Sequence, residues 1–331
     1  MHLGPSMSGH GDITRAWACF AAAVIIATSP CLAACRGGER ADEGMPTQQQ
    51  AQVSVEVTMS GQTLGLESVQ NARELGGYPA EGGRKVRHGR LLRSASLQDL
   101  SERDAKRLRE RFGLSVMADL RTSLEVEESP DPVLDGVNYL DLHVVEDSVI
   151  RRRTADLEDT FGAEGPADES EWAMWMVGRG YADEQSYVQL LSSATGKAGY
   201  RRLFDELIAL PEGRSLLMHG TKGKDRTGLA SMLVLSALGV DERVILKDYL
   251  LSNEFLAAKI EQDRQSLLSA GVEDADELEW CLVTLDKTDE RMMQATLDWM
   301  DSTYGSARDY VTRELGVNQE QLAVLRDKFL E

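Results

Sequence analysis

The sequence predicts an α/β fold in which a central sheet is flanked by helices. Two short apolar runs of strand length, residues 114–120 and 215–218, are separated and followed by segments with helical patterns. Residues 229–238 are apolar nearly all round, which is typical of a buried helix. Strands that alternate with helices in this way indicate an α/β domain.

The elements before the first of these strands are marked by alternation and by turn residues. Residues 53–57 alternate between apolar and polar side chains and predict a strand. Residues 76–79 and 81–83 are glycine-rich and predict turns. A helix is predicted to begin at Ser101, with acidic residues in its first turn, and to end before Gly113.

Residues 146–185 interrupt this pattern. They are charged, contain glycine and proline and show no regular period, so we expect an irregular insertion or a lid. Helices are predicted from Ser186, followed by a strand and then by several helices. The insertion carries large apolar side chains that we expect to serve packing rather than substrate contact: Trp172, Met174, Trp175 and Met176.

The composition is that of a globular protein with an excess of acidic residues. The 331 residues are 42% hydrophobic and 27% charged, and the formal net charge is −19. This charge argues against a nucleic-acid groove or a polybasic membrane patch as the main function. An anionic ligand would therefore have to be held by a local positive site.

Cysteine and histidine usage predicts neither a disulfide framework nor a metal site. Three of the four cysteines lie in the first 35 residues, and Cys281 alone cannot form an internal disulfide in the rest of the chain. We interpret Cys281 as a small buried apolar residue. The histidines lack the spacing of metal ligands, so no metal or other cofactor is predicted: His2, His10, His88, His143 and His219.

Residues 1–34 have the features of a signal peptide. Arg15 precedes an apolar run over residues 16–27, which is too short to span a bilayer. The sequence Leu-Ala-Ala-Cys that ends at Cys35 resembles the cleavage box of bacterial lipoproteins. We expect an exported protein, anchored to a membrane by a lipid on Cys35 and facing the periplasm or the cell exterior, with residues 35–57 as lipidated N-terminus and tether. The alternatives are an ordinary signal peptide and a frayed tail with a chance cysteine.

Residues 219–228 have the chemistry of an anion-binding loop. Their sequence is His-Gly-Thr-Lys-Gly-Lys-Asp-Arg-Thr-Gly, and they lead into the buried helix that Gly239 ends. A strand, a glycine-containing loop and a helix direct backbone N–H groups and the positive end of the helix dipole at one point. Lys222, Lys224 and Arg226 add positive charge, and an arginine can bind a tetrahedral anion through two nitrogens.

The loop does not match a nucleotide-binding P-loop. That motif requires glycine, four further residues and then Gly-Lys-Ser/Thr. Here Lys224 is followed by Asp225, and Gly220 lies only three residues before Gly223.

The loop closely resembles the signature His-Cys-x-x-Gly-Lys-Asp-Arg-Thr-Gly of bacterial tyrosine phosphatases related to the dual protein and phosphoinositide phosphatases. Every position matches except the second, where Gly220 replaces the cysteine. The resemblance covers about residues 61–330 and implies a cysteine-phosphatase-like fold for residues 58–331. Further landmarks of the family follow in order at residues 71–78, 89–94, 118–121, 248–253, 304–310 and 315–316.

The resemblance implies roles for the loop residues. In the family, the cysteine thiolate attacks phosphorus, the arginine and the loop amides stabilise the phosphate oxygens, and an acid protonates the leaving oxygen. Asp225 is the candidate general acid. The phosphate cradle would consist of Thr221, Lys222, Gly223, Lys224, Asp225 and Arg226.

Four further residues are implied as supports of the loop. Thr227 would have supported the thiolate, and His219 is expected to hydrogen-bond the loop backbone. Asp119 and Arg121 would flank the pocket or, alternatively, form a structural ion pair that braces the loop.

Gly220 has no side chain with which to attack phosphorus, so the covalent route is absent. Thr221 offers only an unactivated hydroxyl, and Cys281 has no anion loop near it in sequence. His219 could in principle attack phosphorus, but a histidine at this position more often hydrogen-bonds the loop backbone. Attack by water, assisted by Asp225, would be slow. Phosphate binding need not suffer, because a thiolate would repel a phosphate dianion.

The sequence therefore predicts a pseudophosphatase that binds phosphate monoesters with little or no turnover. Its ligand would be a phosphotyrosine-containing protein or a phosphoinositide-like molecule. One alternative is an active phosphatase that uses an unusual nucleophile or whose recorded sequence is in error at Gly220. Another is a degenerate relic with only a structural role.

Overall fold

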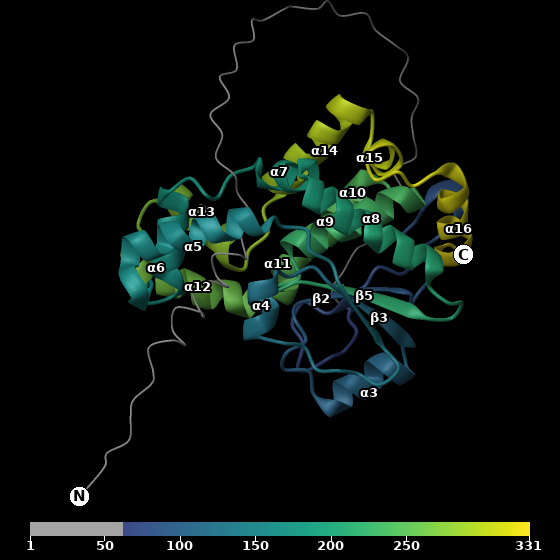
Figure 1. The fold of residues 1–331 in the computed structure, drawn as a ribbon, viewed down its shortest axis with the longest axis horizontal. Coiled ribbons are helices and arrows are strands. Elements are labelled where there is room, and N and C mark those ends of the chain that lie inside the picture. The colour runs from purple at the N-terminus through teal and green to yellow at the C-terminus, as the bar shows by residue number, and fades with distance from the viewer. Residues whose placement is uncertain (1–61) are drawn as a thin grey trace, which may run out of the picture.

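The structure is a computed structural model, and it describes residues 62–331 (Figure 1). The predicted signal peptide, the lipidation site Cys35, the tether and the predicted strand at residues 53–57 lie outside the described residues. Within the described part of the chain, no helix has the length and apolar character needed to cross a membrane.

A five-stranded sheet forms the centre of the fold, with the strand order β1-β2-β5-β3-β4. β1 runs antiparallel to β2, and the other neighbours are parallel. The α/β fold and the strands predicted at residues 114–120 and 215–218 are confirmed. The strands are β1 (Arg73–Glu74), β2 (Leu91–Ser94), β3 (Leu114–Asp119), β4 (Asn138–Asp141) and β5 (Ser215–His219).

Helices and two 3-10 turns make up most of the remaining described chain. In order they are η1 (Glu81–Gly83), α3 (Glu102–Glu110), α4 (Ser123–Glu128), α5 (Asp147–Phe161), η2 (Gly162–Glu164), α6 (Glu169–Gly178), α7 (Ser186–Ser192), α8 (Ala194–Ala209), α9 (Asp225–Leu238), α10 (Glu242–Leu250), α11 (Ser252–Phe255), α12 (Ala257–Ser269), α13 (Ala275–Leu285), α14 (Glu290–Tyr304), α15 (Ala307–Arg313) and α16 (Gln319–Phe329).

The residues predicted to begin and end helices do so in the structure. α3 begins after Ser101, whose side chain accepts a hydrogen bond from the backbone N–H of Asp104. α9 is the predicted buried helix, and it ends at Gly239, whose φ of 81° is in the left-handed region. It begins at Asp225, so the last residues of the anion-binding loop already belong to its first turn.

Alternating strand residues supply two apolar layers. Leu216 and Met218 of β5 belong to the core cluster that includes α8, α9 and α10, whereas Leu217 belongs to the cluster beneath α3. Figure 1 shows α3 on one side of the sheet and α8, α9 and α10 on the other. β5 is therefore buried on both faces, which explains its continuous apolar sequence.

The expectation that residues 146–185 are irregular is wrong, because α5 and α6 are regular helices. α5 is mostly exposed and buries only a narrow apolar stripe that includes Ile150 and Leu157, so its period is weak in the sequence. The large apolar residues of the insertion do pack as predicted, but Trp172 also lines the pocket described below. Trp172, Trp175 and Met176 are buried with residues of α12 and α13, which lie beside α5 and α6 in Figure 1.

Candidate functional site

The site lies at the carboxyl edge of the sheet, where β5 passes into α9. Ser94 at the end of β2 and Asp119 at the end of β3 are both level with His219 at the end of β5. In α/β sheets, ligands bind outside the carboxyl ends of the strands. Here the N-terminus of α9 points its unpaired backbone N–H groups toward the same place.

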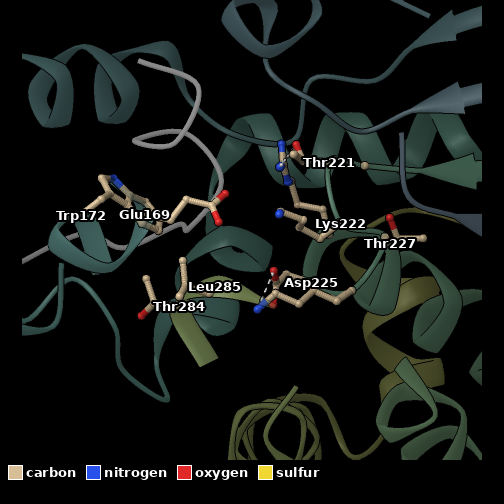
Figure 2. A pocket seen from close by; sticks show the side chains of 12 residues that line it. Glu169, Trp172, Thr221, Lys222, Asp225, Thr227, Thr284 and Leu285 are labelled. Atoms are coloured by element: carbon tan, nitrogen blue, oxygen red, sulfur yellow. Dashed lines mark hydrogen bonds and ion pairs between the residues drawn. The ribbon is translucent and has the colours of Figure 1, made fainter. Parts of the chain in front are cut away.

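A pocket with an empty volume of about 440 Å³ opens over this loop. The loop residues that the sequence predicted as a phosphate cradle all line it, together with Gly220 and Thr227. Figure 2 shows Glu169 of the insertion extending toward the loop from the opposite side, beside Trp172, Thr284 and Leu285. The insertion therefore contributes one wall of the pocket.

Arg226 is held by Glu125, a residue that the sequence analysis missed. Nη1 and Nη2 of Arg226 each donate to one carboxylate oxygen of Glu125 at 2.7 Å, and Nη1 also donates to the Leu120 carbonyl at 3.1 Å. Although burial opposes ionisation, Arg226 holds the pKa of Glu125 below its usual value. The hydroxyl of Thr221 donates to the same carboxylate. This two-point contact fixes the plane of the guanidinium in the pocket wall.

A sequence signal for Glu125 exists. Thr122 and Glu125 form the capping box of α4, in which the Thr122 side chain accepts from the N–H of Glu125 and the Glu125 side chain accepts from the N–H of Thr122. The Thr-x-x-Glu pattern directly follows β3, at the edge of the sheet that carries the site.

The outer side of the loop is braced by residues from β2 and the segment before β1. Nδ2 of Asn71 donates to the carbonyls of Lys222 and Gly223, each at 3.1 Å, and Nη2 of Arg93 donates to the Gly223 carbonyl at 2.8 Å. These bonds hold the carbonyls away from the pocket. Gly223 has a φ of 66°, and a Cβ there would lie 2.3 Å from the Ser94 carbonyl oxygen, so this position requires glycine.

Asp248 of α10 anchors these braces. Its carboxylate accepts from Arg73 Nε at 3.1 Å, from Arg93 Nη1 at 2.6 Å and from the Tyr78 hydroxyl at 2.9 Å. The two arginines hold the pKa of Asp248 below its usual value against the opposing effect of burial. The landmarks at residues 71–78, 89–94 and 248–253 therefore converge behind the loop.

Asp225, the predicted general acid, reaches the pocket from the first turn of α9. Its side chain is 20% exposed, and its Oδ2 lies 3.6 Å from Nζ of Lys224. The hydroxyl of Tyr187 donates to Oδ1, and Tyr249 lies 2.9 Å behind it, hydroxyl to hydroxyl. The position of Asp225 is compatible with proton transfer to a leaving group in the pocket.

Both loop lysines are already engaged with α13 and the turn that follows it. Nζ of Lys224 donates to the carbonyls of Val283 and Lys287, and the residue is 2% exposed. Nζ of Lys222 lies 3.3 Å from Oδ2 of Asp286. Their charges, like that of Arg226 in its pair with Glu125, therefore reach the pocket in a partly compensated form, and the backbone N–H groups of the loop add to them.

His219, Asp119 and Arg121 lie beneath the loop rather than in the pocket. The expectation that His219 hydrogen-bonds the loop backbone is wrong. Its ring lies between two carboxylates, with Nε2 3.3 Å from Asp131 Oδ2 and Nδ1 3.8 Å from Asp119 Oδ1. Asp119 lies at the end of β3, level with His219, and Asp131 comes from the loop between α4 and β4. Arg121 pairs with Asp119 at 2.7 Å and with Asp131 at 2.8 Å, which is the geometry of the structural ion pair.

Gly220 does not have a backbone conformation that requires glycine, since its φ lies outside the left-handed region. Apart from atoms of Gly220 itself and of the two residues adjacent in the chain, the nearest described atom to a Cβ built there would be the hydroxyl oxygen of Thr227 at 3.2 Å. A side chain at this position would therefore fit after a small shift of Thr227.

Cys281 is not close enough to the loop to line the pocket and is fully buried among α6, α12 and α13. Burial raises the pKa of its thiol to about 12. This agrees with its interpretation as a small apolar residue.

Comparison with known proteins matches residues 64–331 to the model of the tyrosine phosphatase family. The triple specificity protein phosphatase PtpB of Mycobacterium tuberculosis is 31% identical over 269 residues, which cover 74% of this chain and 92% of the relative. A Cupriavidus necator protein whose name places it among tyrosine-protein phosphatases is 30% identical over 262 residues, covering 78% of this chain and 86% of the relative. The family model covers most of the chain, including the anion-binding loop and all five strands. The chain therefore belongs to the tyrosine phosphatase family.

Proposed function

We propose that this domain binds phosphate monoesters without efficient hydrolysis and acts as a pseudophosphatase. The observation that carries the proposal is Gly220, which stands at the first loop position after β5, where the family signature has its cysteine. The anion-binding elements remain beside it. Arg226 is oriented by Glu125, and the loop is braced by Asn71 and Arg93.

We propose a phosphotyrosine-containing protein or a phosphoinositide-like molecule as the ligand. The family description and the names of the relatives point to phosphorylated proteins. The lysines do not favour the phosphoinositide strongly, because Lys222 is paired with Asp286 and Lys224 with backbone carbonyls.

Turnover of p-nitrophenyl phosphate tests the proposal. We expect the wild-type protein to be inert and Gly220→Cys to hydrolyse the substrate, because the pocket would then contain a thiolate at the N-terminus of α9. Gly220→Ala is the matched control, since it adds a Cβ without sulfur. Turnover by the wild-type protein that Arg226→Lys abolishes would contradict the proposal and favour the active phosphatase.

Calorimetry with inorganic phosphate tests binding separately from turnover. The wild-type protein should bind phosphate. Arg226→Lys should weaken phosphate binding by about tenfold, because the lysine ammonium lacks the planar group with which arginine binds both Glu125 and a phosphate. Absence of binding by the wild-type protein would support the relic with only a structural role.

We further propose that the protein is an exported lipoprotein. The proposal is based on the sequence Leu-Ala-Ala-Cys that ends at Cys35 and on the apolar run before it. In a bacterial host grown with an alkyne analogue of palmitate, the wild-type protein should incorporate the label and Cys35→Ala should not. Cys31→Ala serves as a matched control that keeps the label. Equal labelling of both variants would contradict lipidation at Cys35.

A further inference from the structure

We propose that the pocket selects phosphate monoesters that also carry a positive charge, and that Glu169 of the insertion recognises the cationic group. The proposal rests on the proposed phosphate-binding function and names the class of ligand within it. The phosphate of such a ligand lies in the loop, and its cationic group lies at the opposite wall. A small zwitterion and a phosphopeptide with a basic neighbouring residue share this chemistry.

The wall opposite the loop carries a carboxylate. The described residues that line the pocket outside residues 220–227 are Glu169, Trp172, Thr284 and Leu285, and only the first of these is charged. Figure 2 shows the Glu169 side chain extending from this wall toward the loop. The side chain is 34% exposed, so a ligand in the pocket can contact it.

Lys259 compensates the charge of Glu169 only in part. Its Nζ donates to Oε2 of Glu169 at 2.8 Å, but it also donates to Asp263 and lies 3.5 Å from Oδ2 of Asp286. The other ammonium group of this cluster, that of Lys222, lies 3.3 Å from Asp286. Two ammonium groups therefore face three carboxylates. Because Lys259 does not line the pocket, Glu169 exposes the surplus negative charge to the ligand.

The positive side of the pocket lies at the loop. Lys222 and Lys224 belong to the loop, and the N-terminus of α9 directs its backbone N–H groups at the same place. A phosphate is attracted to this side, and a cation is repelled from it. The opposite wall has the reverse polarity. A ligand with a phosphate at one end and a cation at the other is therefore complementary to both sides.

Trp172 makes the same wall suitable for an ammonium group. It follows Glu169 by three residues in α6, so both side chains lie on one face of the helix, and both line the pocket. Aromatic rings attract cations electrostatically, and the indole ring of tryptophan does so most strongly. Leu285 adds apolar surface to this wall, which reduces the screening of charge by water.

Polyanionic ligands are less complementary to this pocket. A phosphoinositide-like ring can carry further phosphates, and a phosphate directed at the opposite wall would meet the carboxylate of Glu169. Like charges repel at short distance, and the net charge of −19 adds repulsion at longer range. Of the two ligand classes proposed above, a phosphoprotein with a basic residue beside its phosphotyrosine therefore fits the pocket better.

Calorimetry on the full chain with O-phosphoethanolamine and monoethyl phosphate tests the inference, because these ligands differ by one ammonium group. At about pH 8 both phosphates are dianions and the amine is protonated. We expect the wild-type protein to bind phosphoethanolamine at least about fivefold more tightly than ethyl phosphate. Glu169→Gln should bring this ratio of affinities toward one, because the amide has no charge.

Glu171→Gln is the matched control. It makes the same change of charge on the same helix, but Glu171 does not line the pocket, so the variant should keep the wild-type ratio. Binding of inorganic phosphate by Glu169→Gln shows that the loop of this variant is intact. Circular dichroism and thermal unfolding confirm that both variants are folded.

Two phosphotyrosine peptides distinguish the sources of the ligand. One has lysine after the phosphotyrosine, and the other has norleucine, which is similar in length but uncharged. A preference for the lysine peptide that Glu169→Gln removes supports the inference and identifies a basic phosphoprotein. A preference that is limited to phosphoethanolamine and is lost in Glu169→Gln supports it and identifies a small zwitterion.

The remaining outcomes separate this inference from the function on which it rests. Equal binding of the charged and uncharged ligands in both comparisons overturns the inference and leaves phosphate binding standing. A preference that Glu169→Gln retains in full also overturns it. Absence of inorganic phosphate binding by the wild-type protein overturns the proposed function itself.

Discussion

At the scale of the residue, the pair of Arg226 and Glu125 determines the shape of the anion site. The two side chains are 4% and 2% exposed, and they share two hydrogen bonds of 2.7 Å. Removal of either partner would leave a buried charge without compensation. The pair therefore orients the guanidinium before any ligand arrives.

Substitution of Glu125 by alanine should lower the free energy of unfolding by about 3–5 kcal/mol, because the Arg226 charge would remain buried. Urea unfolding measures this change. Glu67→Ala is the control, because Glu67 and its partner Arg103 are both 70% exposed in their side chains. An exposed pair of this kind contributes less than about 1 kcal/mol. Equal losses in the two variants would contradict the structural role of Glu125.

At the scale of the element, a cluster of charges ties the insertion to the loop. Lys259 of α12 lies 2.8 Å from Glu169 of α6 and 3.5 Å from Asp286 after α13, and it also pairs with Asp263. Asp286 in turn pairs with Lys222 of the loop at 3.3 Å. The wall formed by the insertion and the anion loop are therefore connected through α12 and the end of α13.

Asp263 should make stability depend on pH. Burial, reinforced by the Asp286 carboxylate and opposed by Lys259, raises the pKa of Asp263 to about 6. An aspartate in the unfolded chain titrates near pH 3.9, about two units lower. The folded state therefore binds this proton more tightly, and the stabilisation that protonation gives is complete below about pH 4 and is lost as the pH rises to about 6.

Urea unfolding across this pH range compares the wild-type protein with Asp263→Asn. The variant should lack this component of the decline, because asparagine has no proton to lose. Asp99→Asn, at an exposed position, should follow the wild-type curve. A variant Asp263→Asn with the full wild-type decline would show that another group is responsible.

At the scale of the whole molecule, the insertion is held to the domain by its own apolar cluster. Met176 is fully buried in this cluster, with Trp172 of the same helix and Cys281 and Leu282 of α13. One wall of the pocket is built on α6, so the integrity of this cluster affects the site as well as the fold.

Met176→Ala should lower the free energy of unfolding by about 2–5 kcal/mol through the cavity it creates. Thermal or urea unfolding measures the effect. Met174→Ala on the same helix is the matched control, because Met174 is only partly buried and its removal should cost less. A larger loss in Met174→Ala would show that the cluster does not hold the insertion as described.

Much of the fold could be predicted where local chemistry is decisive. The cap at Ser101, the stop at Gly239 and the apolar run of β5 each act through neighbours in the chain. The insertion was wrongly predicted to be irregular. The helix α5 buries only a narrow apolar face, so the helical period of apolar residues is weak in its sequence. Asp119 and Arg121 lie beneath the pocket because Arg121 also pairs with Asp131. Asp131 is ten residues further along the chain, and no local pattern indicates this contact.

The order of strand, anion loop and buried helix could be predicted from the sequence, and so could the presence of Gly220 where the family signature has a cysteine. These are properties of consecutive residues. The pairing of Glu125 with Arg226, the contacts of Asn71 and Arg93 with the loop carbonyls, and the contacts of the loop lysines with α13 emerge only in the folded chain. These contacts join residues far apart in the chain, and they exist because the parallel strands bring their carboxyl ends to one edge of the sheet.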